Sequence, residues 1–530
     1  MSASFHIENF GCRAARADGE AIADRLRAAG LSERQPSLAD VVVINTCSVT
    51  AEADREARAF IRRAHRLNPN ARIVATGCYA QRAPEELAAL TGVAAVVGNS
   101  HKAFAPEVAL SLIAPTAGRR TLAPQQRANG LIQIQPAPAE TASPQVIWAN
   151  DYIQTAQAEL AAPQVLADDR FAHSFLEEAE LLPGAQTRPN LKVQEGCSNR
   201  CTFCVIPQTR GSSRSLPAET ILRQIRGFVA AGGNELVLSG INLGRWGRDL
   251  ASSSDADRPP LAGLVRAVLE QTDLPRLRLS SIEPMDWDAN LVALMAEFGG
   301  MRLARHAHLP LQSGSDTVLR RMHRRYRPWH YADKVAALLR AAGSDLTLGA
   351  DVMVGFPGET DGEFEETAEL IRALPFGYLH LFPFSPRPGT PAWALYAARP
   401  VPAAVVEERM TALRALAAQK SGLHRSRFVG RELDAITLNT PDSQTSRGCT
   451  SALTENFLPI KVGASLPANR LIRVRVTGIA SDGALLASEG ACVPAPSDLL
   501  AAVYVAPPQA TPGIGPMLYS GCAREPAAIP

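Results

Sequence analysis

The sequence predicts an α/β protein with three folded parts: an N-terminal open parallel α/β domain, a central barrel-like parallel sheet, and a small C-terminal antiparallel β-barrel. Two patterns predict this organisation. Apolar, β-branched runs alternate with helical stretches between residues 4 and 98, and again between residues 190 and 382. Short alternating strands follow from about residue 425. At 530 residues the chain is too long for one compact core, and its length therefore agrees with a division into several domains.

Composition and charge exclude several classes of protein. The 54 basic and 52 acidic residues leave a net charge of +2, so any nucleic-acid surface must be a local patch. No apolar run reaches the ~18 residues of a membrane span, and the N-terminus lacks the pattern of a secretory signal. Nine cysteines without a signal peptide indicate reduced thiols in a cytoplasmic protein, where they serve metals or redox chemistry.

The N-terminal part places three cysteines alike. Strands are predicted over 4–12, 41–47, 71–78 and 94–97, with helices over 18–30, 51–67 and 84–90. Cys12, Cys47 and Cys78 each end one of the first three strands. Because ligands collect at the carboxyl ends of parallel strands, these cysteines are expected to converge on one shared metal cluster. The alternative is three buried core cysteines.

The central part repeats the alternation of strand and helix. Its strands are predicted over 191–194, 235–240, 276–282, 305–311, 346–354 and 377–382, separated by helices over 218–230, 261–271, 288–298, 331–342 and 359–374. Right-handed crossovers would arrange these strands as a barrel-like sheet with its site in the loops at the strand carboxyl ends. The expected boundaries are 1–103 for the N-terminal domain, 104–188 for a Pro- and Ala-rich connector, 189–424 for the central core, 425–490 for the small barrel and 491–530 for a flexible tail.

A cysteine loop opens the central part. Cys197, Cys201 and Cys204 follow the pattern C-x3-C-x2-C, and no further cysteine occurs before Cys449. A closed zinc site and an ordinary ferredoxin cluster both need four protein ligands. Three thiolates would instead fill three corners of a 4Fe-4S cluster and leave one iron open to a small ligand, which points to chemistry rather than electron transfer alone. The alternative is a zinc knuckle that takes a distant fourth ligand.

Taken in this order, the two cysteine triplets resemble the radical-SAM methylthiotransferases, over roughly residues 5–102 and 190–485. The resemblance implies two 4Fe-4S clusters with S-adenosylmethionine (SAM): an auxiliary cluster held by Cys12, Cys47 and Cys78, and a SAM-binding cluster held by Cys197, Cys201 and Cys204. It also implies a radical-SAM partial (β/α)6 barrel and a TRAM-like C-terminal barrel that holds tRNA. No catalytic residue beyond the cluster ligands is expected.

Within this family, two stretches resemble the branch that acts on threonylcarbamoyladenosine: residues 45–54 (NTCSVTAEAD) and 76–81 (TGCYAQ). The implied reaction adds a methylthio group to C2 of N6-threonylcarbamoyladenosine at tRNA position 37, with SAM as both radical source and methyl donor. Two positions depart from the family pattern. Ala15 and Arg16 stand where Asn-Gln is usual after the first cysteine, and Gln208 stands where Tyr usually follows the Ile-Pro of the cysteine loop.

The resemblance also suggests contacts for SAM and RNA. The SAM-contacting candidates are Gly232, Gly233, Glu235, Ser281, Glu283, Gly355 and Phe356. Each also has an ordinary interpretation as a turn or a helix start.

A basic run supplies the RNA-binding candidates, in which cations would meet phosphates and an aromatic ring would stack on a base: Arg320, Arg321, Arg324, Arg325, Tyr326 and Arg327. A second candidate face carries Arg55, Arg58, Arg62 and Arg63.

The expected partners are the tRNA anticodon loop and an electron donor such as a flavodoxin or a ferredoxin, with no membrane and no DNA. Alternative functions are a methylthiotransferase acting on isopentenyladenosine in tRNA or on a ribosomal-protein aspartate, a non-catalytic iron–sulfur carrier, and a zinc-based RNA-binding module.

Overall fold

The computed structural model describes residues 3–113, 163–171, 187–250, 261–446 and 448–488, and the backbone of 491–492. Most of the predicted connector and nearly all of the predicted tail lie outside these residues.

The N-terminal part contains a six-stranded sheet in the order β2-β1-β3-β4-β5-β6, and all of its strand pairs are parallel. The strands are β1 (Ser4–Asn9), β2 (Ser32–Glu33), β3 (Val41–Thr46), β4 (Arg72–Gly77), β5 (Val93–Gly98) and β6 (Gln164–Leu166). The helices are α1 (Arg13–Ala28), α2 (Ala51–Leu67), α3 (Cys78–Arg82), α4 (Pro84–Ala88), the 3-10 helix η1 (Asn99–Phe104) and α5 (Ala105–Ile113).

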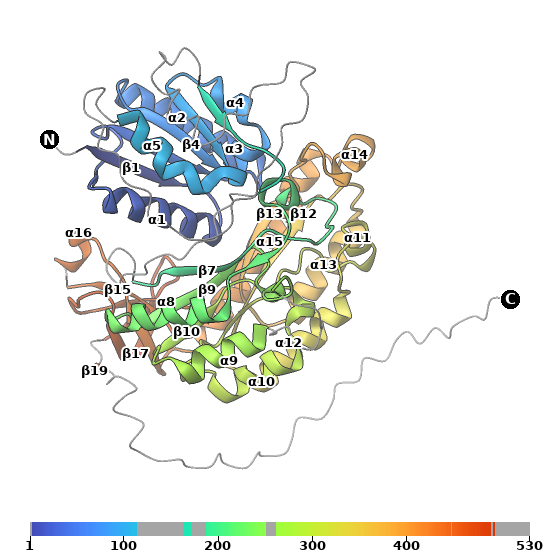
Figure 1. Cartoon of the computed structure of the whole chain (residues 1–530). Coiled ribbons are helices and arrows are strands. Elements are labelled where there is room, and N and C mark those ends of the chain that lie inside the picture. The colour runs from blue at the N-terminus through green and yellow to red at the C-terminus, as the bar shows by residue number, and fades with distance from the viewer. Residues whose placement is uncertain are drawn as a thin grey trace, which may run out of the picture. The chain divides into compact units, whose positions relative to one another are not determined.

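Both faces of this sheet are covered by helices, which explains the apolar run of β3. Val41 and Val43 pack with α1 and α5 on one face, whereas Val42 and Ile44 pack with α2, α3 and α4 on the other (Figure 1). Successive side chains of a strand point to opposite faces, so a strand that is buried on both sides needs apolar residues throughout. The open parallel α/β domain is therefore confirmed.

Two elements of the predicted connector belong to this sheet domain. Helix α5 packs against the sheet through Ala105, Val108 and Ala109, and β6 pairs with β5 along the edge of the sheet. Residues 104–188 are therefore not connector throughout.

The central part contains six parallel strands in chain order. β7, β9 and β10 form one ladder, β11, β12 and β13 form another, and backbone hydrogen bonds such as Ile282 N to His308 O join the two. The strands are β7 (Asn190–Glu195), β8 (Arg214–Ser215), β9 (Glu235–Gly240), β10 (Arg276–Leu279), β11 (His306–His308), β12 (Thr347–Val354) and β13 (Phe376–Pro383). Short β8 pairs antiparallel with β7.

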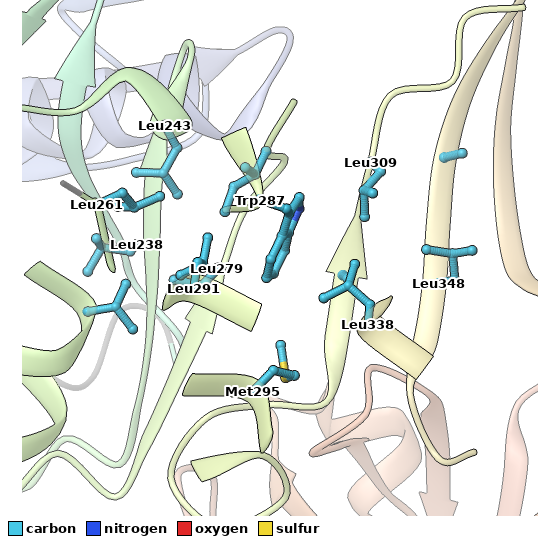
Figure 2. Close-up of a cluster of buried hydrophobic side chains, with 14 of the residues drawn as sticks. Leu238, Leu243, Leu261, Leu279, Trp287, Leu291, Met295, Leu309, Leu338 and Leu348 are labelled. Carbon is cyan, nitrogen blue, oxygen red and sulfur yellow. The ribbon is translucent and has the colours of Figure 1, made fainter. Parts of the chain in front are cut away.

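Helices cover the outer face of this partial barrel, and the largest apolar core lies beneath them around Trp287 (Figure 2). The helices are α7 (Ile206–Arg210), α8 (Ala218–Ala230), the 3-10 helices η2 (Leu243–Arg245) and η4 (Pro284–Asp286), α9 (Leu261–Gln271), α10 (Ala289–Phe298), α11 (Asp316–Arg321), α12 (Pro328–Ala342), α13 (Asp361–Ala373), α14 (Pro391–Ala398) and α15 (Ala403–Ser426). Since the outward side chains of the strands fill this core, the inner face of the barrel is left for polar residues.

The C-terminal part is a closed barrel in the order β14-β15-β16-β18-β17, closed by pairing of β14 with β17, and all of these pairs are antiparallel except β16 with β18. Its elements are β14 (Glu432–Thr437), α16 (Asp442–Thr445), β15 (Thr450–Thr454), β16 (Pro459–Val462), β17 (Leu471–Ile479), β18 (Leu485–Ala487) and β19 (Ala491–Cys492). Its own core includes Leu433, Ile460 and Val474. The predicted small barrel is thereby confirmed. None of the helices in the described ranges has the length and apolarity needed to cross a membrane.

Candidate active site

The first cysteine triplet lies at one edge of the N-terminal sheet. Strands β1, β3 and β4 are neighbours in parallel register, with Asn9 opposite Asn45 and Thr46 opposite Gly77. Cys12 follows β1 and caps α1, Cys47 follows β3, and Cys78 follows β4 as the first residue of α3. The structure therefore brings the three thiols together at the carboxyl ends of three adjacent strands, as the sequence predicted.

The surroundings of this triplet suit a positively charged metal centre. Burial, together with the neighbouring Cys78 and Cys12, raises the pKa of the Cys47 thiol to about 12. Three thiolates at this edge therefore need a cation to compensate for their charge. Gly11 has a φ of +107°, and a β-carbon there would lie 2.8 Å from Sγ of Cys47. Only glycine permits this close approach, so the donor set and its backbone suit an iron–sulfur cluster.

The second triplet lies in the loop between β7 and α7. Cys197 accepts hydrogen bonds from the backbone N–H of Asn199 and from Nδ2 of Asn242, both at 3.4 Å. Burial raises the pKa of Cys204 to about 12, and the nearby Cys201 and Cys197 add to this shift. The loop therefore gathers three sulfur atoms at the carboxyl end of the first barrel strand, an arrangement that suits a cluster with one open iron.

A buried ion pair lies against this loop. Arg324 donates Nη2 to Oε1 of Glu283 at 2.7 Å and Nη1 to Sγ of Cys201 at 3.4 Å. Glu283 and Cys201 raise the pKa of Arg324 well above its ordinary value despite its burial. Tyr326 fixes the arginine from the other side through a hydrogen bond of 3.2 Å with its Nε. A guanidinium thus sits between a cluster ligand and a carboxylate at the carboxyl end of β10.

A second buried arginine links the first triplet to the end of β7, the strand that leads into the second cysteine loop. Nε of Arg210 lies 3.3 Å from Sγ of Cys78, while its Nη1 donates to Glu195 at 2.7 Å and to Asp18 at 3.2 Å. Asp18 also binds Lys102 and Lys192. Burial alone would raise the pKa of Asp18, but these cations hold it below its usual range. We call these five residues, Asp18, Lys102, Lys192, Glu195 and Arg210, the charge network.

The inner face of the second ladder carries a chain of titratable groups. Tyr378 hydroxyl lies 2.8 Å from Nε2 of His306 and 3.0 Å from Nδ1 of His308. Asp351 then accepts from His308 at 3.2 Å and from His380 at 3.1 Å. The ligand atoms of His308, Asp351 and His380 all lie within 4.8 Å of one another. This chain can pass a proton toward solvent at His380, or its last three members can hold a divalent ion.

The predicted SAM-contacting glycine pair lies at the wrong end of its strand. Gly232 and Gly233 precede β9, and Asn234 donates to the backbone oxygen of Asn469 in the C-terminal barrel at 2.8 Å. Glu235 is buried in ion pairs with arginines. These three candidates, Gly232, Gly233 and Glu235, are therefore corrected, because the cysteine loop lies at the carboxyl end of β9. Asn242, which lies at that end and contacts Cys197, was missed.

The other SAM candidates follow strands at the carboxyl ends. Ser281 and Glu283 follow β10, and Glu283 lies in the ion pair with Arg324. Gly355 follows β12 with a φ of +76°, and its N–H donates to Glu359 at 2.8 Å. The Phe356 ring is buried edge-on against Phe384, so only its backbone is free to approach a ligand. Contact of these residues with SAM stays a prediction.

The basic run from Arg320 to Arg327 does not form one exposed face. Tyr326 is fully buried and donates its hydroxyl to the backbone oxygen of Pro310, and Arg324 lies in the ion pair with Glu283. The RNA-binding prediction is therefore corrected for Tyr326 and Arg324, because a buried ring cannot stack on a base. The remaining arginines pair with carboxylates: Arg320 and Arg327 with Asp316, Arg321 with Glu363, and Arg325 with Asp286.

The second candidate RNA face lies on α2. Arg55, Arg62 and Arg63 are exposed, whereas Arg58 is half-buried and donates to the Tyr79 hydroxyl at 2.6 Å. This face keeps more charge in solvent than the 320–327 run and stays a prediction.

Comparison with known proteins identifies the class. Residues 191–371 match the radical SAM superfamily, and residues 4–98 match uncharacterized protein family UPF0004. The partial barrel with its three-cysteine loop is thus that of a radical SAM enzyme.

Full-length relatives narrow the class further. The threonylcarbamoyladenosine tRNA methylthiotransferase of Bacillus subtilis is 33% identical over 89% of this chain and 93% of its own length. That of Aquifex aeolicus is 32% identical over 89% of this chain and 99% of its own. The tRNA-2-methylthio-N(6)-dimethylallyladenosine synthase of Novosphingobium aromaticivorans is 34% identical over 78% of this chain and 81% of its own length. The chain belongs to the radical SAM methylthiotransferase family.

Proposed function

We propose that the protein adds a methylthio group to C2 of N6-threonylcarbamoyladenosine at position 37 of tRNA, and that it uses SAM both as radical source and as methyl donor. The observation that carries the proposal is the pair of cysteine triplets, each at the carboxyl ends of parallel strands, with Arg210 bound both to Cys78 and to Glu195 at the end of β7. The relatives named for this substrate, which align over 89% of the chain, support it.

Two 4Fe-4S clusters are proposed, one on each triplet. When bound with SAM, they supply a carbon-centred radical and a transferable sulfur. Cys197, Cys201 and Cys204 would hold the SAM-binding cluster, and Cys12, Cys47 and Cys78 the auxiliary one. The electrons would come from a flavodoxin or a ferredoxin.

The chain's own residues prepare this chemistry. Arg324 compensates the charge of Cys201 and orients the Glu283 carboxylate at the mouth of the barrel. Asn242 donates to Cys197, and Asn99 donates to Cys78 at 3.3 Å. Buried donors aimed at thiolate sulfur stabilise the deprotonated ligands and raise the reduction potential of a cluster.

The tRNA anticodon loop is proposed to approach through the C-terminal barrel and the exposed arginines of α2. Small five-stranded barrels bind nucleic acid in other proteins, and the α2 arginines offer cations to phosphates. Ser281, Gly355 and the backbone of Phe356 are proposed to contact SAM, because they follow strands at the carboxyl edge.

The test is nucleoside analysis of tRNA by mass spectrometry in a strain that lacks the gene. We expect 2-methylthio-N6-threonylcarbamoyladenosine to disappear, unmodified N6-threonylcarbamoyladenosine to accumulate, and a plasmid copy to restore the product. If the methylthio nucleoside persists unchanged in the deletion strain, the proposed substrate is wrong.

A second candidate substrate is isopentenyladenosine, because a relative named for the dimethylallyl nucleoside is 34% identical. The same mass spectra distinguish the two, since its product would be lost instead. If both methylthio nucleosides persist in the deletion strain while a ribosomal peptide lacks its methylthio group, the protein is the protein-modifying alternative. Detection of 5′-deoxyadenosine from the reduced protein with SAM would exclude a non-catalytic carrier.

A further inference from the structure

Three arginines share one buried carboxylate in the interior of the central part, and a fourth arginine lies close to them. Glu235, which is fully buried, pairs with Arg278 at 3.0 Å and with Arg276 and Arg188 at 3.5 Å. Arg13 joins them from the N-terminal domain. We call Arg13, Arg188, Arg276 and Arg278 the arginine cluster. Its cations outnumber the one carboxylate that binds them.

Arg13 has no hydrogen bond and no ion pair with any described residue, although it is half-buried. Its guanidinium carbon lies 5.6 Å from the centroid of the Phe457 ring, and that of Arg278 lies 5.3 Å from the same centroid. The two guanidinium groups therefore gather around one ring, and of the two only Arg278 is ion-paired, with Glu235.

Two buried nitrogen atoms beside this ring also lack partners within the described part of the chain. They are Nη1 of Arg278, whose side chain is fully buried, and Nδ1 of His306, whose ring centroid lies 4.3 Å from that of Phe457. Nε2 of His306 bonds Tyr378. In the tautomer of the neutral ring whose Nε2 accepts from the Tyr378 hydroxyl, the proton is on Nδ1, and that atom is then an unbonded donor. Burial and nearby arginines such as Arg278 push the pKa of His306 far down and keep it neutral.

An unpartnered buried donor is costly, and an unpaired buried cation is more costly still. The Phe457 ring offsets part of this cost, because a cation over a ring gains roughly 0.5–2 kcal/mol. A ring does not neutralise charge, however, and it leaves the N–H groups unbonded. The cluster therefore has the electrostatics of a site built for an oxyanion.

We propose that the arginine cluster binds the carboxylate of the N6 substituent of the substrate nucleoside, with Arg13 and Arg278 as the donors. This rests on the proposed function. A threonylcarbamoyl group ends in a carboxylate, whereas an isopentenyl group is apolar. The planar guanidinium donates two parallel N–H bonds to a carboxylate, which gives both affinity and orientation. Arg13 and Arg278 are thus the residues that select the anionic substrate.

The position of Arg13 favours the base substituent over a backbone phosphate. Arg13 directly follows Cys12, an exposed ligand of the proposed auxiliary cluster, and its guanidinium lies near Tyr378 on the inner barrel face. A base that leaves its stack to reach a buried reactive centre takes its substituent with it, while its phosphates stay at the entrance. Arg13, a half-buried cation beside the first cysteine triplet, is therefore placed to bind the N6 substituent of the base rather than a phosphate.

The test compares binding of three anticodon stem-loop RNAs to the reconstituted full-length protein. Their nucleoside 37 is N6-threonylcarbamoyladenosine, its carboxamide analogue or isopentenyladenosine. The variants are Arg13→Gln, Arg13→Lys and the control Arg16→Gln, which removes an exposed arginine of the same helix. We expect the wild type to bind the carboxylate RNA about tenfold or more tightly than the carboxamide RNA, as a charge-assisted hydrogen bond implies.

Arg13→Gln should lose this preference by weakening the carboxylate RNA alone, Arg13→Lys should keep part of it, and Arg16→Gln should leave the ratio unchanged. Equal weakening of all three RNAs in Arg13→Gln would mean a phosphate contact and would overturn the proposal, as would an unchanged ratio. Nucleoside analysis separates this from the proposed function. If the wild type produces the methylthio form of N6-threonylcarbamoyladenosine while Arg13→Gln keeps the preference, only the carboxylate site is wrong.

Discussion

Nε of Arg210 lies 3.3 Å from Sγ of Cys78, so a residue from the helix after the second cysteine loop contacts a cysteine of the first triplet. Its Nη1 is held by Glu195 and Asp18, one from the barrel and one from the N-terminal domain. The first cysteine triplet and the strand that leads into the second cysteine loop therefore share one buried charge network. Replacing one member of the charge network should affect the auxiliary triplet and the contact between the two domains together.

Arg210→Gln should destabilise the protein strongly. It leaves Asp18 and Glu195 buried with one cation fewer, and breaking a buried ion pair costs about 3–5 kcal/mol. Arg210→Lys keeps the charge but loses the Nε donor, so it should lose less stability and still show fewer bound irons. Thermal unfolding and iron content measure the two effects. Arg66→Gln, at an exposed position near the end of α2, should stay within about 0.5 kcal/mol of the wild type. Unaltered stability and iron content in Arg210→Gln would contradict the role of the network.

Arg324→Gln should impair SAM cleavage. The variant leaves Glu283 and the Cys201 thiolate without their shared cation in a buried place. We expect the rate of 5′-deoxyadenosine formation to fall by about tenfold or more, since one lost charge-assisted contact is worth that much. Arg324→Gln should also bind less iron, because the Cys201 thiolate loses its cation. The double variant Arg324→Gln/Glu283→Gln removes both charges of the ion pair, so its iron content should return to the wild-type value while the rate stays low. Recovery of both in the double variant would show that Glu283 serves only to neutralise the arginine.

The two cysteine triplets should be separable by mutation. Cys47→Ala should reduce the iron content from about eight to about four per chain, abolish methylthio transfer and leave 5′-deoxyadenosine formation measurable. Cys201→Ala should abolish both reactions. Cys449→Ala is the matched control, since this half-buried cysteine of the C-terminal part should change neither iron content nor product. Iron analysis and product chromatography on anaerobic protein decide the outcome, and about eight irons in Cys47→Ala would refute an auxiliary cluster at this triplet.

Sequence reasoning located the cysteines because their positions follow from strand order alone. Cys12, Cys47 and Cys78 each end a parallel strand, and adjacent parallel strands must bring such ends together. The same rule could have excluded Gly232 and Gly233, because this pair precedes its strand, and could have found Asn242, which follows it.

The arginines could not be assigned in this way. Arg324 and Tyr326 looked like part of a continuous basic face, but α11 ends at Arg321 and the backbone turns at His323, which has a φ of +54°. The turn directs Arg324 inward to Glu283. Arg210 meets Asp18 across 192 positions of sequence. Such contacts depend on how the domains dock, and no local pattern encodes them.

The pH dependence of stability should include a term from His424 in α15. This histidine is buried, lies 2.9 Å through Nε2 from Oγ1 of Thr347, and packs edge-on against Phe428 at 5.3 Å. Burial, together with the charges of Arg427 and Arg425, lowers its pKa from 6.5 to about 4. Between these values the unfolded chain binds a proton that the folded chain does not, so stability must fall as the pH falls.

The contribution should therefore be fully present above pH ~6.5 and lost progressively down to pH ~4, and in total it should amount to about 3 kcal/mol. Chemical unfolding of cluster-free protein at several pH values measures it. His424→Gln cannot titrate, so its unfolding free energy should fall less steeply than that of the wild type across this range. His330→Gln, at an exposed position on α12, is the matched control and should keep the wild-type slope. Equal slopes for the wild type and His424→Gln would show that His424 accepts its proton without unfolding, and that the contact with Thr347 does not hold the ring neutral.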